Sequence, residues 1–289
     1  MPKIALVTYR DLPELCDDDR LLLEYLNGHG VQAEAVVWDA QDVTWDNFSC
    51  VVLRSCWDYH LQPREFAEWV NRLAAAEIPM LNPTETVLWN MDKAYLQDLS
   101  RNGIKVVPTV TLRKGEPTDL HSILETHGWD EAVIKPSISA TAFKTWRTTL
   151  ADARNNNAKF QQMLADSDML VQPLIKEVAH KGEWSLVFFG GEYSHAVLKR
   201  PREGDFRVQE MYGGSSTRET PPNELVAQAR EVLSRSGRAW SYARVDGVEV
   251  GGELVLMELE LIEPYLFLSE HPQAPRRFAE AILSYLGKL

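Results

Sequence analysis

Strand-like and helix-like segments alternate over residues 1–85, and this alternation constrains the fold more than any other feature of the 289-residue chain. Apolar runs typical of strands occur at residues 4–8, 31–38 and 50–53, and helical apolar spacing occurs at residues 18–27 and from Pro63 onward. Such alternation is typical of a parallel sheet with helices on its faces, which binds ligands beyond the carboxyl ends of its strands. We therefore expect an N-terminal α/β domain over residues 1–85.

A different pattern follows residue 85 and predicts two α+β units, over residues 86–170 and 171–289. The first contains a short helix near residues 92–100 and strand-like runs at residues 105–112 and 132–135. From Met169 onward strands dominate, at residues 169–175, 183–189, 193–199, 243–250 and 253–262, with one helix at residues 224–236. Glycine pairs at 190–191 and 251–252 lie between strand-like runs and predict tight β-hairpins.

Charge and cysteine content exclude several classes of protein. Thirty basic and 42 acidic residues give a net charge of −12, so nothing favours general attraction to the phosphates of a nucleic acid. No apolar run reaches the roughly 18 residues that span a membrane. The three cysteines have no C-x-x-C spacing, which argues against a disulfide framework and a zinc site. We expect a cytoplasmic protein with small-molecule partners, and a homodimer is compatible with the sequence.

The most informative motif is Arg244-x-Asp246 followed by Glu258-x-Glu260 on adjacent strand-like runs. Side chains two residues apart share one face of a strand, so three carboxylates can converge across this hairpin. Neighbouring carboxylates repel by roughly 4 kcal/mol at about 4 Å and an effective dielectric near 20, which a divalent cation relieves. Oxygen ligands without His or Cys suit Mg²⁺. A solvated strand whose glutamates pair with lysines explains the spacing equally well.

Basic residues earlier in the chain are candidates for binding an anion. Lys93 and Lys135 each lie in apolar surroundings, and such lysines either extend to water or face an anion. The loop at residues 201–216 is basic and rich in glycine, with Arg207 near its centre. It is either a surface hairpin or a cover for a phosphate chain.

A third candidate group follows the strand-like run at residues 50–53. Arg54, Trp57 and Tyr59 offer a cation for a substrate carboxylate and aromatic walls for an amino-acid-sized ligand. Packing at the end of a strand explains these residues equally well.

The order of these motifs resembles the ATP-grasp superfamily of carboxylate-amine ligases, especially the branch with ribosomal-protein glutamate ligases, bacterial glutathione synthetases and D-cycloserine synthetase. The resemblance spans the chain and is strongest over residues 82–264. It implies an ATP-grasp fold, in which an N-terminal parallel α/β domain precedes two α+β subdomains that grip ATP. The site residues that it implies are Lys93, Lys135, Gln172, Leu174, Ile175, Glu177, Lys199 and Arg207 for ATP, Asp246, Glu258 and Glu260 for two Mg²⁺ ions (Mn²⁺ being the alternative), and Arg244 with Arg207 for catalysis.

Three positions depart from the pattern of the family. Glu260 stands where relatives carry asparagine, which adds a negative charge but keeps an oxygen donor. The loop at residues 136–142 lacks the glycines that many relatives use to cover the phosphates, so small residues must replace them. Residues 183–185 read Glu-Trp-Ser where many relatives have an arginine, so that contact does not transfer.

The resemblance implies an ATP-dependent carboxylate-amine or carboxylate-thiol ligase. It would form an acyl phosphate on a small amino-acid or peptide-like substrate and release ADP and phosphate. A cyclo-ligase that closes one substrate on itself, and a small-molecule kinase with the same ATP site, stay open as alternatives. An ATP-sensing module without catalysis is disfavoured by the gathered like charges. A nicotinamide oxidoreductase is disfavoured because no G-x-G-x-x-G motif follows the first strand-like run.

Overall fold

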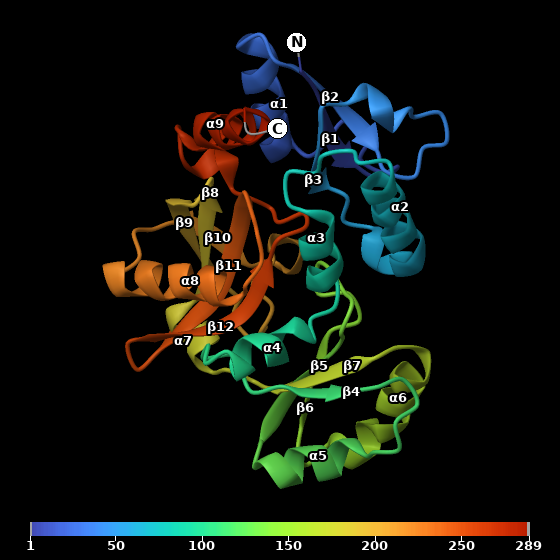
Figure 1. The fold of residues 1–289 in the computed structure, drawn as a ribbon. Helices are drawn as coiled ribbons and strands as arrows, with labels where there is room; N and C mark the ends of the chain where they lie inside the picture. Colours follow the sequence, from blue (N-terminus) through green and yellow to red (C-terminus); the bar gives the residue numbers. More distant parts are fainter. Residues whose placement is uncertain (1, 288–289) are drawn as a thin grey trace.

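The N-terminal region is a parallel α/β unit, as the alternation predicts. The computed structural model describes residues 2–287 and contains three sheets (Figure 1). The first has the order β2-β1-β3 and is built from β1 (Lys3–Thr8), β2 (Gln32–Val37) and β3 (Cys50–Ser55). Its connections include α1 (Asp17–Gly28) and the short turn η1 (Trp45–Asn47), and η2 (Tyr59–Leu61) and α2 (Pro63–Ala75) follow β3.

The second sheet is antiparallel and has the order β4-β7-β5-β6. Its strands are β4 (Val110–Leu112), β5 (Glu131–Pro136), β6 (Trp146–Thr149) and β7 (Met169–Pro173), and α5 (Leu120–His127) and α6 (Ala153–Asp166) pack on it. The strand expected over residues 105–112 is wrong for its first part. Val107 N donates to Leu256 O instead, and Pro108 has no amide hydrogen for a ladder.

The third sheet has five strands in the order β10-β9-β8-β11-β12. They are β8 (Glu183–Phe189), β9 (Glu192–Arg200), β10 (Ser215–Arg218), β11 (Tyr242–Val250) and β12 (Glu253–Glu260). Helical elements precede or connect the strands of this sheet along the chain. They are α3 (Thr84–Asn90), α4 (Tyr95–Arg101), α7 (Glu177–Lys181), η3 (Glu210–Tyr212) and α8 (Asn223–Arg235). Both predicted glycine hairpins are confirmed, because all four glycines have positive φ angles.

The C-terminal segment returns to the N-terminal region, which the sequence analysis did not predict. After η4 (Leu268–Glu270), helix α9 (Ala274–Leu286) lies beside α1 (Figure 1). Phe278 and Ile282 of α9 share a core with Leu22 and Leu26 of α1. Because β7 belongs to the second sheet and extends to Pro173, the expected boundary at residue 170 falls inside a strand.

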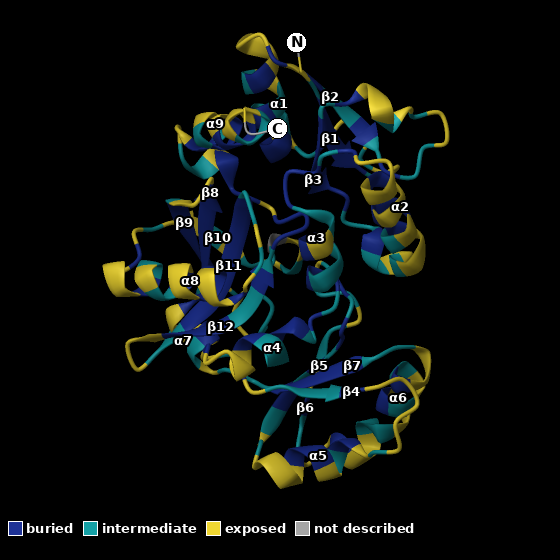
Figure 2. Cartoon of the chain, in the orientation of Figure 1, coloured by how far each residue is buried: buried dark blue, intermediate teal, exposed yellow. Residues whose placement is uncertain are grey.

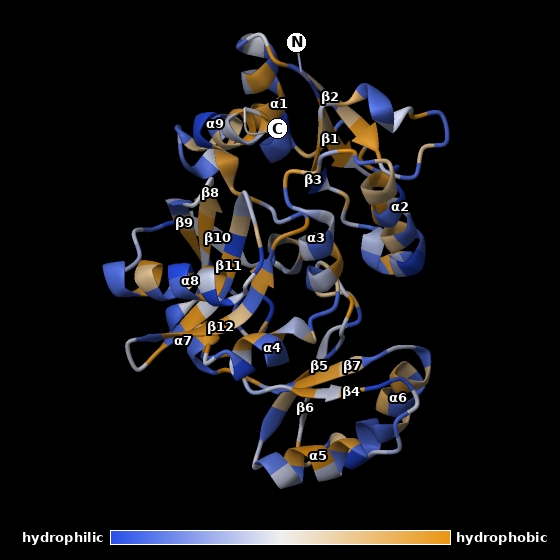
Figure 3. Ribbon diagram, viewed as in Figure 1, coloured by the Kyte–Doolittle hydropathy of each residue, from blue (hydrophilic) through white to orange (hydrophobic). Residues whose placement is uncertain are grey.

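Burial follows the sheets. The strands at the centre of the third sheet are buried and apolar, whereas the outer face of α8 is exposed and polar (Figures 2 and 3). Helix α4 covers this sheet with Tyr95, Leu96 and Leu99. Within residues 2–287, no helix combines the length and apolar character needed to cross a membrane.

Candidate active site

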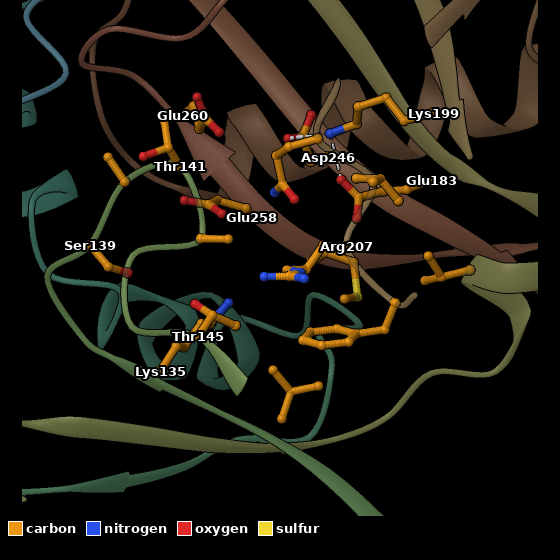
Figure 4. Close-up of a pocket in the computed structure, with 18 of the residues that line it drawn as sticks. Lys135, Ser139, Thr141, Thr145, Glu183, Lys199, Arg207, Asp246, Glu258 and Glu260 are labelled. Carbon is orange, nitrogen blue, oxygen red and sulfur yellow. Dashed lines mark hydrogen bonds and ion pairs between the residues drawn. The ribbon is translucent and has the colours of Figure 1, made fainter. Parts of the chain in front are cut away.

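A cavity of about 660 Å³ lies between the second and third sheets. This volume is in the range typical of small-molecule sites. Figure 4 shows Lys135 and Ser139 on one side and Asp246, Glu258 and Glu260 on the other. Carboxylates from one sheet therefore face a cation from the other across a single cavity.

Strand register brings the charged groups of the hairpin together. Arg244 of β11 lies opposite Glu260 of β12, and Asp246 lies opposite Glu258. Residues opposite each other in an antiparallel pair point to the same face. The register shifts after Asp246, where a Cβ on Gly247 would meet Leu254 Cδ1 at 2.7 Å. A bulge with a residue that has no side chain therefore follows the two charged pairs Arg244–Glu260 and Asp246–Glu258.

Asp246 is the most enclosed of the three carboxylates and is 2% exposed. It accepts hydrogen bonds from Arg244 Nε at 2.9 Å and Nη2 at 2.8 Å, from Ser185 Oγ at 2.6 Å and from Lys199 Nζ at 3.2 Å. Lys199 also pairs with Glu183 at 2.6 Å. Burial opposes the charge on Asp246, but Arg244 and Lys199 outweigh it, so the pKa of this carboxyl is lowered. Asp246 is thus held ionised by the residues around it.

Glu258 links the hairpin to the two predicted lysines. Its carboxylate lies 3.1 Å from Lys93 Nζ, which also donates a hydrogen bond to Ser139 O. Burial opposes its charge, but Lys93 and Lys135 together lower the pKa of Glu258. Lys135 makes no hydrogen bond or ion pair with another residue of the described chain 2–287. Burial lowers the pKa of Lys135, although Glu258 opposes this effect.

Glu260 forms an ion pair with Arg244 Nη2. Burial, followed by repulsion from Glu258 and Asp246, outweighs that pair and raises the pKa of Glu260 to about 7. The guanidinium of Arg244 also donates to Tyr265 O at 2.8 Å. Arg244 therefore connects two carboxylates and the segment that follows β12.

The donor chemistry of these carboxylates fits Mg²⁺, which prefers oxygen ligands. Within residues 2–287, however, no three acidic, histidine or cysteine side chains converge on one point in the manner of a metal site. Both Asp246 oxygens accept hydrogen bonds from Arg244. The predicted ligands share a cavity and a sheet face, and metal binding would require them to exchange these partners.

Known proteins match this chain over nearly its whole length. Residues 4–82 match the family of the N-terminal domain of D-cycloserine synthetase DcsG. The chain is 28% identical to the cycloserine biosynthesis protein DcsG of Streptomyces lavendulae over 277 residues, which cover 92% of each protein. A crystal structure of D-cycloserine synthetase DcsG matches with a TM-score of 0.88 and 28% identity, over 98% of this chain and 99% of that one.

The sequence and structure comparisons together support an ATP-grasp carboxylate-amine ligase. Two more distant structures show the same fold. D-alanine–D-alanine ligase from Bacillus anthracis complexed with ATP has a TM-score of 0.71 and 14% identity, covering 100% of this chain and 98% of that one. A RimK domain protein from Sphaerobacter thermophilus has a TM-score of 0.72 and 19% identity, covering 96% and 98%. The predicted resemblance to ATP-grasp ligases and the predicted fold class are confirmed, and the protein is an ATP-dependent ligase.

The ATP-grasp loop at residues 201–214 carries Arg207 to the cavity. Arg207 forms two hydrogen bonds with Asp205, from Nε at 3.1 Å and Nη2 at 2.8 Å, and its guanidinium stacks 3.7 Å from the centre of the Tyr212 ring. The hydrogen bonds from Arg207 lower the pKa of Asp205. The predicted phosphate-binding arginine is thus in the cavity wall, paired within its own loop.

The loop at residues 136–142 lacks glycine, but its end and the residues just after it contain left-handed backbone. Thr141, Ala142 and Lys144 have φ angles of 50°, 57° and 51°. Such conformations cost of order 1–3 kcal/mol each and persist where surrounding structure fixes them. Thr141 and Ala142 line the cavity. Thr141 and Ala142 therefore take the backbone conformation that glycine would adopt most easily.

The predicted adenine linker is placed in part as expected. Gln172, Leu174 and Ile175 line the cavity, and Gln172 Nε2 donates to Thr109 Oγ1 at 2.9 Å. Glu177, the residue predicted to bind ribose, is in the first turn of α7 and does not line the cavity. Its assignment is therefore not supported by the structure. Glu183 is the acid of this region that reaches the cavity.

The expectation that Arg54 meets a substrate carboxylate is wrong. Its side chain is fully buried and donates to Asp19 Oδ1 at 2.9 Å, to Leu53 O at 3.1 Å and to Pro264 O at 2.6 Å. A guanidinium that has lost all contact with water needs such partners. Asp19, which the sequence analysis did not group with Arg54, supplies the negative charge that balances it. Trp57 and Tyr59 do line the cavity.

Sequence reasoning missed Glu263, a cavity residue that is 8% exposed. Burial, followed by repulsion from Glu260, raises the pKa of Glu263 to about 8. A signal was present, since this acid stands alone in the otherwise uncharged sequence Leu-Ile-Glu-Pro-Tyr-Leu-Phe-Leu at residues 261–268. The Arg-x-Asp and Glu-x-Glu motif ends at Glu260 and therefore does not single out Glu263.

Proposed function

We propose that this ligase transfers the γ-phosphoryl group of ATP to the carboxylate of a small amino-acid-like substrate. An amine then attacks the acyl phosphate, the new C–N bond forms, and phosphate leaves, so that ADP and phosphate are the by-products. The observation that carries the proposal is the arrangement of Lys93, Lys135, Arg207 and Arg244 around the same cavity as Asp246, Glu258 and Glu260. The loops at residues 136–142 and 201–214 contribute to the cavity lining, and exclusion of water would protect an acyl phosphate from hydrolysis.

The lysines would position the phosphate chain. Lys135 has no partner among the residues of the described chain, so its ammonium is available to an anion. Lys93 is held by Ser139 O and Glu258 and can share its remaining donor. Arg207 would exchange Asp205 for phosphate oxygens, which its planar fork fits equally well.

Asp246, Glu258 and Glu260 would hold Mg²⁺, whose charge would neutralise phosphate oxygens during transfer. We propose Mg²⁺ over Mn²⁺, and two ions rather than one, because three carboxylates are provided. Arg244, which projects from the same sheet face, would bind the transferring phosphoryl group. Preorganised contacts of this kind lower the barrier because they need no rearrangement when charge develops.

A second candidate reaction is intramolecular closure of one substrate, with carboxylate and amine in the same molecule. The similarity to D-cycloserine synthetase over 98% of this chain favours it. A kinase shares the nucleotide site but leaves the phosphoryl group on its product. The three reactions therefore differ in their products and in how many organic substrates they need.

The test is a panel of amino acids and dipeptides, alone and in pairs, with ATP and Mg²⁺, monitored for ADP release. We expect ADP and free phosphate in equal amounts, with mass spectrometry showing a new amide. Release with a single compound and an intramolecular C–N bond would indicate the cyclo-ligase. A phosphorylated product without free phosphate would indicate a kinase and overturn the ligase proposal.

A further inference from the structure

The segment at residues 261–266, which we call the carbonyl strap, is held by side chains from distant parts of the chain. Each of its six carbonyl oxygens accepts a hydrogen bond from a side chain of the described structure. The donors, in order along the strap, are Asn82 (2.7 Å), Tyr242 (2.6 Å), Trp57 (3.1 Å), Arg54 (2.6 Å), Arg244 (2.8 Å) and His195 (2.9 Å). These six hydrogen bonds restrict the conformation of a segment that has no regular secondary structure of its own.

The carbonyl strap holds the Glu263 side chain in the wall of the cavity. Its carboxyl has no hydrogen bond or ion pair with a side chain elsewhere in residues 2–287, and its own backbone amide gives the only favourable backbone contact. Tyr59, which is 4% exposed, also lines the cavity, and its hydroxyl likewise has no hydrogen bond within the described residues. Among charged groups, Glu263 acts most strongly on the Tyr59 phenol. Two polar groups that have no hydrogen-bond partner among the described residues thus face the same cavity.

Unpartnered polar groups in a buried position are costly, and a carboxylate most of all. Proteins retain them chiefly where a ligand supplies the missing partner. The ammonium of Lys93 contacts Ser139 O and Glu258, and it forms no ion pair with Glu263 within the described residues. Arg54 and Arg244 are close along the strap, but they are committed to its carbonyls and to Asp19, Asp246 and Glu260.

We propose that the Glu263 carboxylate and the Tyr59 hydroxyl bind the ammonium group of an amino-acid-like substrate. This inference rests on the proposed function, because it identifies what the substrate of that reaction must carry. An ammonium group has three donors and one positive charge, which suit a carboxylate and a hydroxyl oxygen. Trp57 and Tyr265, whose ring centres are 6.3 Å apart, line the same part of the cavity and offer aromatic faces to a cation.

The backbone of Glu263 lies next to Trp57, beyond the hairpin carboxylates along the chain. Three residues beyond Glu260 along the chain, Glu263 adjoins Trp57 through its carbonyl, whereas Glu258 adjoins the lysines. A substrate whose ammonium lies at Glu263 would point its other end toward Arg244 and the hairpin carboxylates. Burial and then repulsion from Glu260 raise the pKa of Glu263, and Lys93 offsets them only in part.

The test compares the wild-type protein with Glu263→Gln and Tyr59→Phe, and uses Glu270→Gln as a matched control because Glu270 lies outside the cavity lining. The probes are D- and L-alanine, D- and L-serine, D-cycloserine and alanyl-alanine, each paired with its N-acetyl derivative. Thermal shifts are measured for each protein alone, with ADP and Mg²⁺, and with ADP, Mg²⁺ and each probe. N-acetylation removes the positive charge but keeps the rest of each probe.

We expect at least one free amine to raise the midpoint of the wild-type protein and of Glu270→Gln, and its N-acetyl derivative to have no effect. Glu263→Gln should weaken the apparent affinity for that amine about 10- to 100-fold, and Tyr59→Phe by less, since a bond to a charged acceptor is stronger than one to a neutral group. Both variants should keep the shift that ADP with Mg²⁺ produces. Full amine binding by Glu263→Gln, or equal binding of acetylated and free probes, would overturn the proposal.

The nucleotide shift separates this proposal from the proposed function. If ADP with Mg²⁺ stabilises the protein but no probe shows a dependence on its amine, the ammonium subsite is refuted and the nucleotide site stands. If ADP with Mg²⁺ has no effect on the wild-type protein, the proposed function itself fails.

Discussion

The hairpin β11–β12 and the loop at residues 201–214 both present an arginine to the same cavity, but they hold it in different ways. Arg244 is buried and joined to Asp246, Glu260 and Tyr265 O, which come from three positions fixed by the sheet and the strap. Arg207 is about a third exposed and pairs with Asp205 two residues away. Tertiary structure therefore adds Glu260 and Tyr265 O to the nearby Asp246 as partners of Arg244, whereas the partners of Arg207 lie within its own loop.

This difference separates contacts that maintain the site from contacts that a ligand can replace. Breaking a buried ion pair leaves an uncompensated charge and costs far more than breaking an exposed one. An exposed arginine can exchange its partner for a phosphate at little cost. We therefore expect substitutions in the hairpin and strap to have large effects on stability or turnover, and substitutions in the loop to act mainly on nucleotide binding.

The largest expected effect is on the buried support of the strap. Arg54→Met should lower the free energy of unfolding by about 3–5 kcal/mol, because Asp19 would remain buried without its partner. Urea unfolding measures the change. Arg64→Met breaks the exposed pair with Glu68 and should change stability by no more than about 0.5 kcal/mol. Equal effects of the two substitutions would contradict the distinction between buried and exposed pairs.

The next effect concerns the hairpin carboxylate that contacts Lys93. Glu258→Gln keeps the size of the side chain but removes its charge, and substrate-dependent ADP release should fall on the order of 10²- to 10³-fold. Circular dichroism should show an unchanged fold. The control is Glu249→Gln, on the same hairpin but outside the cavity, where it pairs with Lys181. Wild-type turnover by Glu258→Gln would remove the hairpin from the proposed mechanism.

A smaller effect should depend on pH and involves His195, which donates to Leu266 O of the strap. Burial lowers the pKa of His195 to about 4, and the hydrogen bond to Leu266 opposes this only in part. Below the ordinary value of 6.5 the unfolded chain takes up a proton that the folded protein does not, so stability falls as pH decreases. At pH 5 the loss should reach about 2 kcal/mol.

The check is urea unfolding of wild type and His195→Gln at pH 7 and pH 5. Glu260 and Glu263, whose pKa values are raised to about 7 and about 8, and His271, whose pKa is lowered by burial, are common to both proteins, so the difference between the two losses reports on His195. Identical losses between pH 7 and pH 5 in the two proteins would show that His195 is not held neutral.

The smallest effect is expected in the loop. Arg207→Ala should raise the KM for ATP about 10-fold, since a single exposed charge contact to phosphate is lost, and should leave the unfolding free energy within about 0.5 kcal/mol of wild type. Arg202→Ala, in the same loop but outside the cavity lining, should change neither quantity. A loss of stability above 2 kcal/mol in Arg207→Ala would show that the loop arginine is structural like Arg244.

Local sequence was sufficient for most of the fold and for the core of the site. Alternating apolar periodicity identified β1, β2, β3, α1 and α2, and glycine pairs located two hairpins. The i, i+2 spacing placed Arg244 with Asp246 on one face, because strand geometry has a period of two residues. The sequence did not predict the packing of segments whose partners are distant in the chain. An example is α9, which packs on α1 although the two lie near opposite ends of the sequence.

The sequence by itself determined which residue types line one face of each strand, since that depends only on backbone periodicity. Tertiary structure decided which charges meet. It buried Arg54 against Asp19 and Pro264 O, paired Lys199 with Asp246, and left Glu263 and Lys135 facing the cavity. The reason is physical, because the energy of a charge depends on its burial and on partners that folding brings from elsewhere in the chain.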